Sequence, residues 1–85
     1  MKKSVLKERD QEKISTKVLQ EKVGLKVREL RERHGISQTE LAIRMNNRDR
    51  QVVQRLEQGR TNFSLNLLRL VSEALGVDIV DLFNE

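Results

Sequence analysis

Four long polar side chains lie close together in one short segment: Arg50, Gln51, Gln54 and Arg55. An arginine can donate two hydrogen bonds to O6 and N7 of guanine, and a glutamine can pair in the same way with N6 and N7 of adenine. In the same segment Val53 and Leu56 have helical spacing, which turns them inward and leaves the polar side chains outside. We therefore expect a short helix whose outer face contacts base edges in the major groove of double-stranded DNA.

Cap and turn residues delimit this helix and another helix before it. Ser37 is a favourable N-cap, and Glu40 three residues later completes the pattern of a capping box. The asparagines at 46–47 are expected to end the first helix, because asparagine tolerates the left-handed backbone better than most residues. Asp49 can cap the next helix, which Gly59 closes. The pattern predicts a helix-turn-helix motif.

Apolar spacing predicts helices elsewhere in the chain as well, and no strand. Leu19, Val23, Val27 and Leu30 form one helical stripe, although Gly24 is an unfavourable residue within it. The predicted fold is all-α with five helices, at about 16–34, 38–45, 50–58, 65–75 and 79–84, in a domain over 15–85. The predicted core comprises Val27, Leu30, Ile36, Leu41, Ala42, Met45, Val53, Leu56, Leu65, Leu68, Val71, Leu75, Val77, Leu82 and Phe83.

The charge distribution favours a polyanionic partner on one side of the domain. The 85 residues carry a net charge of +4. Residues 1–22 and 44–60 are each +3 by count, whereas residues 61–85 are −3. Positive charge near the predicted reading helix suits a phosphate backbone. The sequence has no cysteine, no long apolar run and no signal-peptide pattern, so we expect a cytoplasmic protein without a membrane span.

Several stretches carry a family resemblance: SQTELA at 37–42, V-x-x-L-E-x-G at 53–59, SLNLLRLVSEALGV at 64–77 and DLF at 81–83. Together they resemble the lambda-repressor/Cro-like helix-turn-helix family, also called XRE, over about residues 23–85. The resemblance implies a five-helix domain that binds operator DNA as a homodimer and represses transcription. Two features depart from the family pattern: the turn at 46–48 is one residue longer, and Phe63 stands where the family often has proline.

The resemblance also assigns roles to individual residues. Arg50, Gln51 and Arg55 match the positions that read bases in the family. Gln38 matches the residue that begins the second helix and touches a phosphate. The loop that lies on phosphates corresponds to Arg60, Thr61 and Asn62, and we expect Arg48 in the turn to contact phosphate as well.

Other chemistries have little support in the sequence. His34 is the only histidine and no cysteine accompanies it, so we expect no metal site and no cofactor. Ser37 is close to His34, but no third member of a catalytic triad is evident and we expect no enzyme activity. The glycines are isolated rather than gathered in a phosphate-binding loop. Glu57 is expected to brace backbone or an arginine.

The charged start of the chain, 1–14, allows three interpretations. It can be a solvated tail, an arm that lies along DNA, or an extension of the first helix in which Ile14, Val18 and Leu19 pack on a partner. A basic helix at a membrane surface would lack an aromatic anchor.

The small reading surface predicted for one copy of the chain suggests that a partner takes part in binding. One helix reads only a few base pairs, so we expect a homodimer in which Ile79 and Val80 form the contact, although these residues can instead close the monomer's own core. The alternative is an antitoxin-type protein that neutralises a partner toxin and autoregulates its own operon. A pure interaction module would not bind DNA at all.

Overall fold

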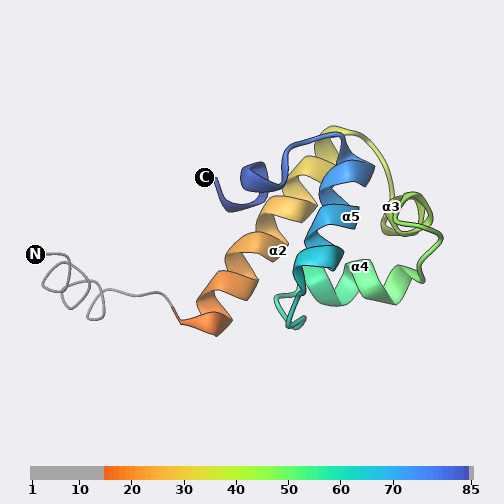
Figure 1. The fold of residues 1–85 in the computed structure, drawn as a ribbon. Coiled ribbons are helices and arrows are strands. Elements are labelled where there is room, and N and C mark those ends of the chain that lie inside the picture. Colours follow the sequence, from red (N-terminus) through yellow and green to blue (C-terminus); the bar gives the residue numbers. More distant parts are fainter. Residues whose placement is uncertain (1–14, 85) are drawn as a thin grey trace, which may run out of the picture.

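The computed structural model describes residues 15–84, and this range contains helices and no strand. The elements are α2 (Thr16–Arg33), α3 (Gln38–Arg44), α4 (Arg50–Glu57), α5 (Leu65–Leu75) and the 3-10 helix η1 (Ile79–Phe83). Figure 1 shows α2 and α5 side by side, with α4 at the lower end of α5 and α3 beyond the far end of α4. Helix α4 packs against α2 and α3. None of these helices is long and apolar enough to cross a membrane. The predicted extension, 1–14, lies outside the described residues.

The all-helical prediction is confirmed, but the number of α-helices is wrong. Residues 15–84 contain four α-helices, and the segment predicted as a fifth is the 3-10 helix η1. Its backbone bonds span three residues, from Asp81 N–H to Asp78 C=O at 2.9 Å. Asp78 Oδ1 accepts from Val80 N–H at 3.2 Å, and Asp81 Oδ2 accepts from Asp78 N–H at 3.2 Å. The Asp78 and Asp81 side chains together form a capping box. The box fixes the start of the helix at Asp78, and a helix of only five residues suits the 3-10 form, which occurs in short pieces.

Serine caps start three of the helices. Ser15, Ser37 and Ser64 each accept a hydrogen bond from the backbone N–H three residues later, at 3.1, 3.0 and 3.1 Å. Each bond satisfies one of the amides that a helix leaves unpaired at its start. The Glu40 carboxylate accepts from Arg44 Nε at 3.2 Å, along the surface of α3.

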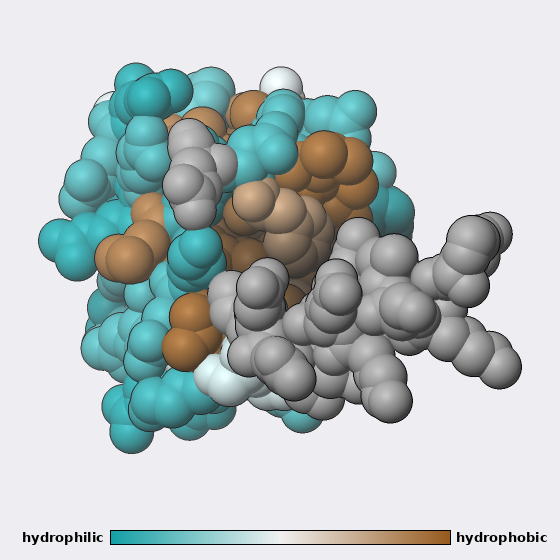
Figure 2. Space-filling model, turned by 90° about the vertical axis from the view of Figure 1, so that its left-hand side faces the viewer, coloured by the Kyte–Doolittle hydropathy of each residue, from teal (hydrophilic) through white to brown (hydrophobic). Residues whose placement is uncertain are grey.

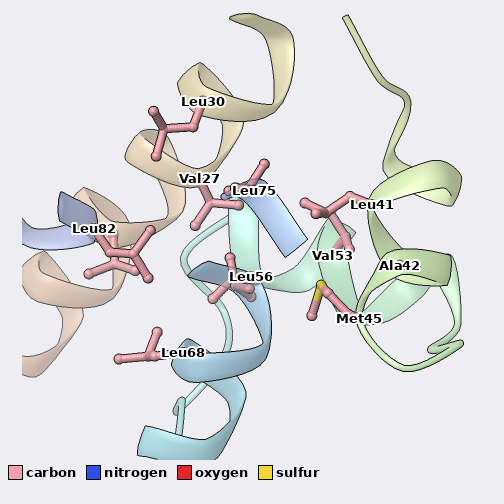
Figure 3. Close-up of a cluster of buried hydrophobic side chains, with 12 residues drawn as sticks. Val27, Leu30, Leu41, Ala42, Met45, Val53, Leu56, Leu68, Leu75 and Leu82 are labelled. Atoms are coloured by element: carbon pink, nitrogen blue, oxygen red, sulfur yellow. The ribbon is translucent and has the colours of Figure 1, made fainter. Parts of the chain in front are cut away.

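The buried core lies where the four helices meet, and Figure 3 shows its side chains converging from all of them. Its members are Val23, Val27, Leu30, Leu41, Ala42, Met45, Val53, Leu56, Leu68, Val71, Leu75 and Leu82. Ile36 and Val77 pack against this cluster and are partly buried.

Two residues predicted for the core lie on the surface. Leu65 is 78% exposed, because it is the first residue of α5 and burial along that helix begins one turn later, at Leu68. Phe83 is 47% exposed. In a 3-10 helix residues three apart share a face, so Ile79 and Leu82 point to the core and Phe83 does not.

Gly24 marks the point at which α2 crosses the end of α4. A Cβ atom at this position would meet the carbonyl oxygen of Leu56, and would lie 2.9 Å from that of Glu57. Because both obstacles are backbone atoms, they cannot rotate away. The residue that is unfavourable for the helix itself therefore permits the close packing of α2 on α4.

Candidate nucleic-acid interface

The turn between α3 and α4 depends on two consecutive asparagines in the left-handed region. Asn46 has φ 66° and Asn47 has φ 60°. The chain then folds back, with Arg48 N–H donating to the carbonyl oxygen of Ala42 at 2.8 Å. Asp49 occupies the N-cap position of α4, but its side chain makes no cap hydrogen bond, contrary to the expected role. The turn fixes the direction in which α4 leaves α3.

The four predicted base-contacting residues lie on the outer faces of α4. Val53 and Leu56 are fully buried and anchor the helix to α2 and α3. Arg50, Gln51 and Arg55 are exposed, and Gln54 is half-buried. A short helix anchored on one side presents these side chains from a fixed backbone.

The residues expected at phosphates flank both ends of α4. Arg48 precedes the helix, and the loop after it carries Arg60, Thr61 and Asn62; all are exposed except Thr61, which is half-buried. Gln38, the first residue of α3, is also half-buried and its side chain makes two hydrogen bonds. The fold therefore brings both predicted sets of residues to the ends and outer faces of one helix.

The arginines around α4 differ from all others in the described range. Outside the segment 48–60, every arginine of residues 15–84 is within 4 Å of a carboxylate: Arg28, Arg31, Arg33, Arg44 and Arg69. Arg48, Arg50, Arg55 and Arg60 pair with no carboxylate of that range. The one glutamate in α4, Glu57, is turned inward to Arg31. The local positive charge is therefore not neutralised by neighbouring side chains.

A buried ion pair joins α2 to α4. Arg31 Nε donates to Glu57 Oε2 at 2.6 Å, and Nη2 donates to Oε1 at 3.1 Å. Arg31 Nη1 also donates to the carbonyl oxygen of Ile36 at 2.9 Å. The two side chains are only 12% and 4% exposed. The hydrogen bond with Glu57 raises the pKa of Arg31; burial opposes this shift, and the charges of Glu57 and Glu32 add to it.

The expectation that Glu57 braces an arginine agrees with this contact, but sequence reasoning did not identify Arg31. A signal was available, because Arg31 follows Val27 by four residues and so lies on the buried face of α2. An arginine on such a face needs a carboxylate or backbone partner.

Beyond the ion pair, the hydrogen bonds continue to α4. Gln38 Nε2 donates to Glu57 Oε1 at 3.1 Å, and Arg50 Nη1 donates to Gln38 Oε1 at 3.1 Å. A chain of side-chain hydrogen bonds therefore runs from the interior to the first residue of α4.

The side formed by α2 and η1 carries apolar side chains among charged ones. A hollow of about 230 Å³ lies between α2 and η1. Its lining includes Leu19, Leu25 and Phe83. Figure 2 looks onto this side and shows apolar side chains gathered there. Of the two residues expected at a dimer contact, Ile79 packs against the core, whereas Val80 is 58% exposed.

Comparison with known proteins agrees with this geometry. The profile of the helix-turn-helix family matches residues 27–82. The chain is similar to the crystal structure of the restriction-modification controller protein C.AhdI from Aeromonas hydrophila, with 36% identity over 75% of this chain and 96% of that one, and a TM-score of 0.72. It is also similar to a hypothetical transcription factor, NHTF, from Neisseria, with 30% identity over 84% of this chain and 80% of that one, and a TM-score of 0.75. No curated protein sequence matches the chain.

The matched segment covers the turn, α4 and the Arg31–Glu57 ion pair, and both similar structures span most of the described residues. The chain therefore belongs to the XRE-type, lambda-repressor-like helix-turn-helix family of DNA-binding regulators.

Proposed function

We propose that this chain is a sequence-specific transcription regulator that binds double-stranded DNA through α4 and the segments flanking it. In this proposal the base readers are Arg50, Gln51, Gln54 and Arg55. The phosphate contacts are made by Gln38, Arg48, Arg60, Thr61 and Asn62.

The observation that carries the proposal is the contrast among the arginines. The other arginines of the described range each pair with a carboxylate of the protein, whereas Arg48, Arg50, Arg55 and Arg60 do not. Guanidinium groups without a carboxylate partner, on and beside one short helix, suit a ligand with closely spaced negative charges and with acceptor atoms on base edges. Similarity to a restriction-modification controller protein and to a hypothetical transcription factor supports the same assignment.

We further propose that the protein acts as a homodimer and represses transcription from a palindromic operator. A single recognition helix covers only a few base pairs, and two copies related by a two-fold axis would place their helices about 34 Å apart, one turn of DNA. The exposed Val80 and Phe83 supply an apolar contact for a second copy. Ile79 contributes less than expected, since it packs partly against its own core.

The proposal is tested by selecting bound sites from random duplexes. We expect an enriched motif with two related half-sites, and binding that weakens with salt by a slope of about 0.9 per phosphate contact. The variant Arg60→Ala should keep the same motif with a shallower slope. If the protein binds duplexes without enriching any motif, its DNA binding is not sequence-specific and the proposal fails on that point.

A second candidate is favoured by the apolar hollow between α2 and η1. An antitoxin-type protein needs a surface for a partner protein apart from its DNA-binding helix, and the side carrying Leu25 and Phe83 meets that need. Co-expression with the product of a neighbouring gene tests this candidate. A stoichiometric complex that Leu25→Glu disrupts, with DNA binding unchanged, would support it; failure of the two proteins to copurify would speak against it.

A further inference from the structure

We propose that the Arg31–Glu57 ion pair determines specificity by positioning Arg50, acting through the side-chain amide of Gln38. This inference rests on the proposed role of Arg50 as a base reader. It assigns to two interior residues an effect on which base pair is preferred, in addition to their effect on stability.

The orientation of the Gln38 amide follows from what its neighbours can do. A carboxylate only accepts hydrogen bonds, and a guanidinium only donates them. Glu57 Oε1 therefore accepts from the amide NH₂ of Gln38 at 3.1 Å, and the amide oxygen of Gln38 accepts from Arg50 at 3.1 Å. Each contact requires the same orientation of the amide, so the two reinforce one another.

Glu57 is itself held in place. Two hydrogen bonds from Arg31 fix both carboxylate oxygens, and a third anchors Arg31 to the backbone at Ile36. With a side chain that is only 4% exposed, Glu57 has little room to turn. In the described range no buried side-chain nitrogen or oxygen lacks a hydrogen-bond partner, so the network has no free group that favours another arrangement.

The consequence at the surface is a restrained Arg50. One of its five N–H donors is used by Gln38, and the others remain available for a base. Holding a flexible side chain before binding lowers the entropy lost on contact, by an amount that corresponds to about a two- to tenfold gain in affinity. Because the gain operates only through Arg50, it applies only to the base pair that Arg50 reads.

The experiment combines Gln38→Met, which keeps the length of the side chain but removes both hydrogen bonds, with Arg50→Ala. Binding is measured on the selected operator and on operators altered at single base pairs. We expect Gln38→Met to lower discrimination about two- to tenfold at the base pair that also depends on Arg50. It should not lower discrimination there any further in the Arg50→Ala background. If Gln38→Met also loses a phosphate contact, the resulting loss of affinity would be the same for all operator sequences.

The interior part of the network is tested by Arg31→Lys, which keeps the charge but loses the forked pairing. It should reduce discrimination at the same base pair. Val71→Ala, a core change outside the network, serves as the control for lost stability and should leave discrimination unchanged. If Val71→Ala has the same effect as Arg31→Lys, the ion pair has only a structural role.

A measurement without DNA separates failure of this inference from failure of the proposed function. NMR signals of the guanidinium N–H groups should show Arg50 more ordered than the exposed Arg55, and Gln38→Met should make the two alike. An Arg50 that is already as mobile as Arg55 in the wild type overturns the positioning. If Arg50 is ordered but Arg50→Ala loses no base discrimination, the base-reading assignment fails, and the effect on specificity fails with it.

Discussion

Gly24→Ala tests the packing of α2 on α4, the proposed reading helix. Alanine is the better helix former by about 1 kcal/mol, so an isolated helix would gain stability. In the folded protein the added methyl group meets two backbone carbonyl oxygens of α4, those of Leu56 and Glu57. Ordinary carbon–oxygen contacts are about 3.3–3.6 Å. Even the 2.9 Å approach to Glu57 is therefore too short, and the helices must separate.

The expected magnitude follows from these opposing effects. Overpacking a core costs about 1–3 kcal/mol, and contact with backbone atoms places this site in the upper part of that range. After the gain in helix propensity, we expect a net loss of about 1–2 kcal/mol in the free energy of unfolding. For a domain of this size the melting temperature should fall by roughly 5–15 °C. Thermal unfolding followed by circular dichroism measures this change.

A control variant distinguishes packing from backbone conformation. Gly76 has φ 70° and nothing lies within 4 Å of the position of its Cβ. Gly76→Ala should lose about 1–2 kcal/mol through the left-handed backbone alone. It should leave operator affinity unchanged well below the melting temperature, whereas Gly24→Ala should weaken it by displacing α4. A Gly24→Ala protein at least as stable as the wild type would refute the reasoning.

Three further results are expected. Arg55→Ala should cost about 1–3 kcal/mol of binding free energy at one or two operator positions, whereas Arg60→Ala should weaken binding to all sequences alike. If competition binding shows that both variants lose the same affinity on every sequence, the division into base and phosphate contacts is contradicted. Val80→Asp should abolish cooperative binding to a palindromic site with little change in melting temperature. Ile79→Asp should also destabilise the monomer, because Ile79 packs against the core. If Val80→Asp still binds both half-sites cooperatively, the dimer contact lies elsewhere. Leu56→Ala, at a position that is fully buried, should cost about 2–5 kcal/mol in denaturant unfolding, and a loss below about 1 kcal/mol would show that α4 is not anchored there.

Local chemistry made much of the fold predictable. The serine caps and the asparagine turn depend on residues within a few positions of each other, so residue type alone indicates them. The helical character follows from the spacing of apolar residues in the same way. The short last helix was harder to predict, because the choice between an α-helix and a 3-10 helix over five residues depends on weak differences and on packing.

Contacts between distant segments were not predictable from local patterns. Gly24 looks like a defect in a helix until α4 is placed against it. Arg31 and Glu57 are 26 residues apart. Glu57 was expected to brace backbone or an arginine, but nothing local in the sequence identified Arg31 as that partner. The candidate interface shows the same limit: its residue types were evident, but the hydrogen bond between Gln38 and Arg50 depends on how α3 and α4 pack.

The central claim is that α4 and its flanks contact DNA, and amide NMR spectra test it most directly. A duplex containing the selected site is added to the labelled protein, and the shift of each backbone amide is followed. We expect the largest shifts at 37–39, 48–55 and 59–62, the ends and outer faces of the helix-turn-helix. Shifts confined to η1 and the apolar side of α2, or no shifts at all at low salt, would contradict the account.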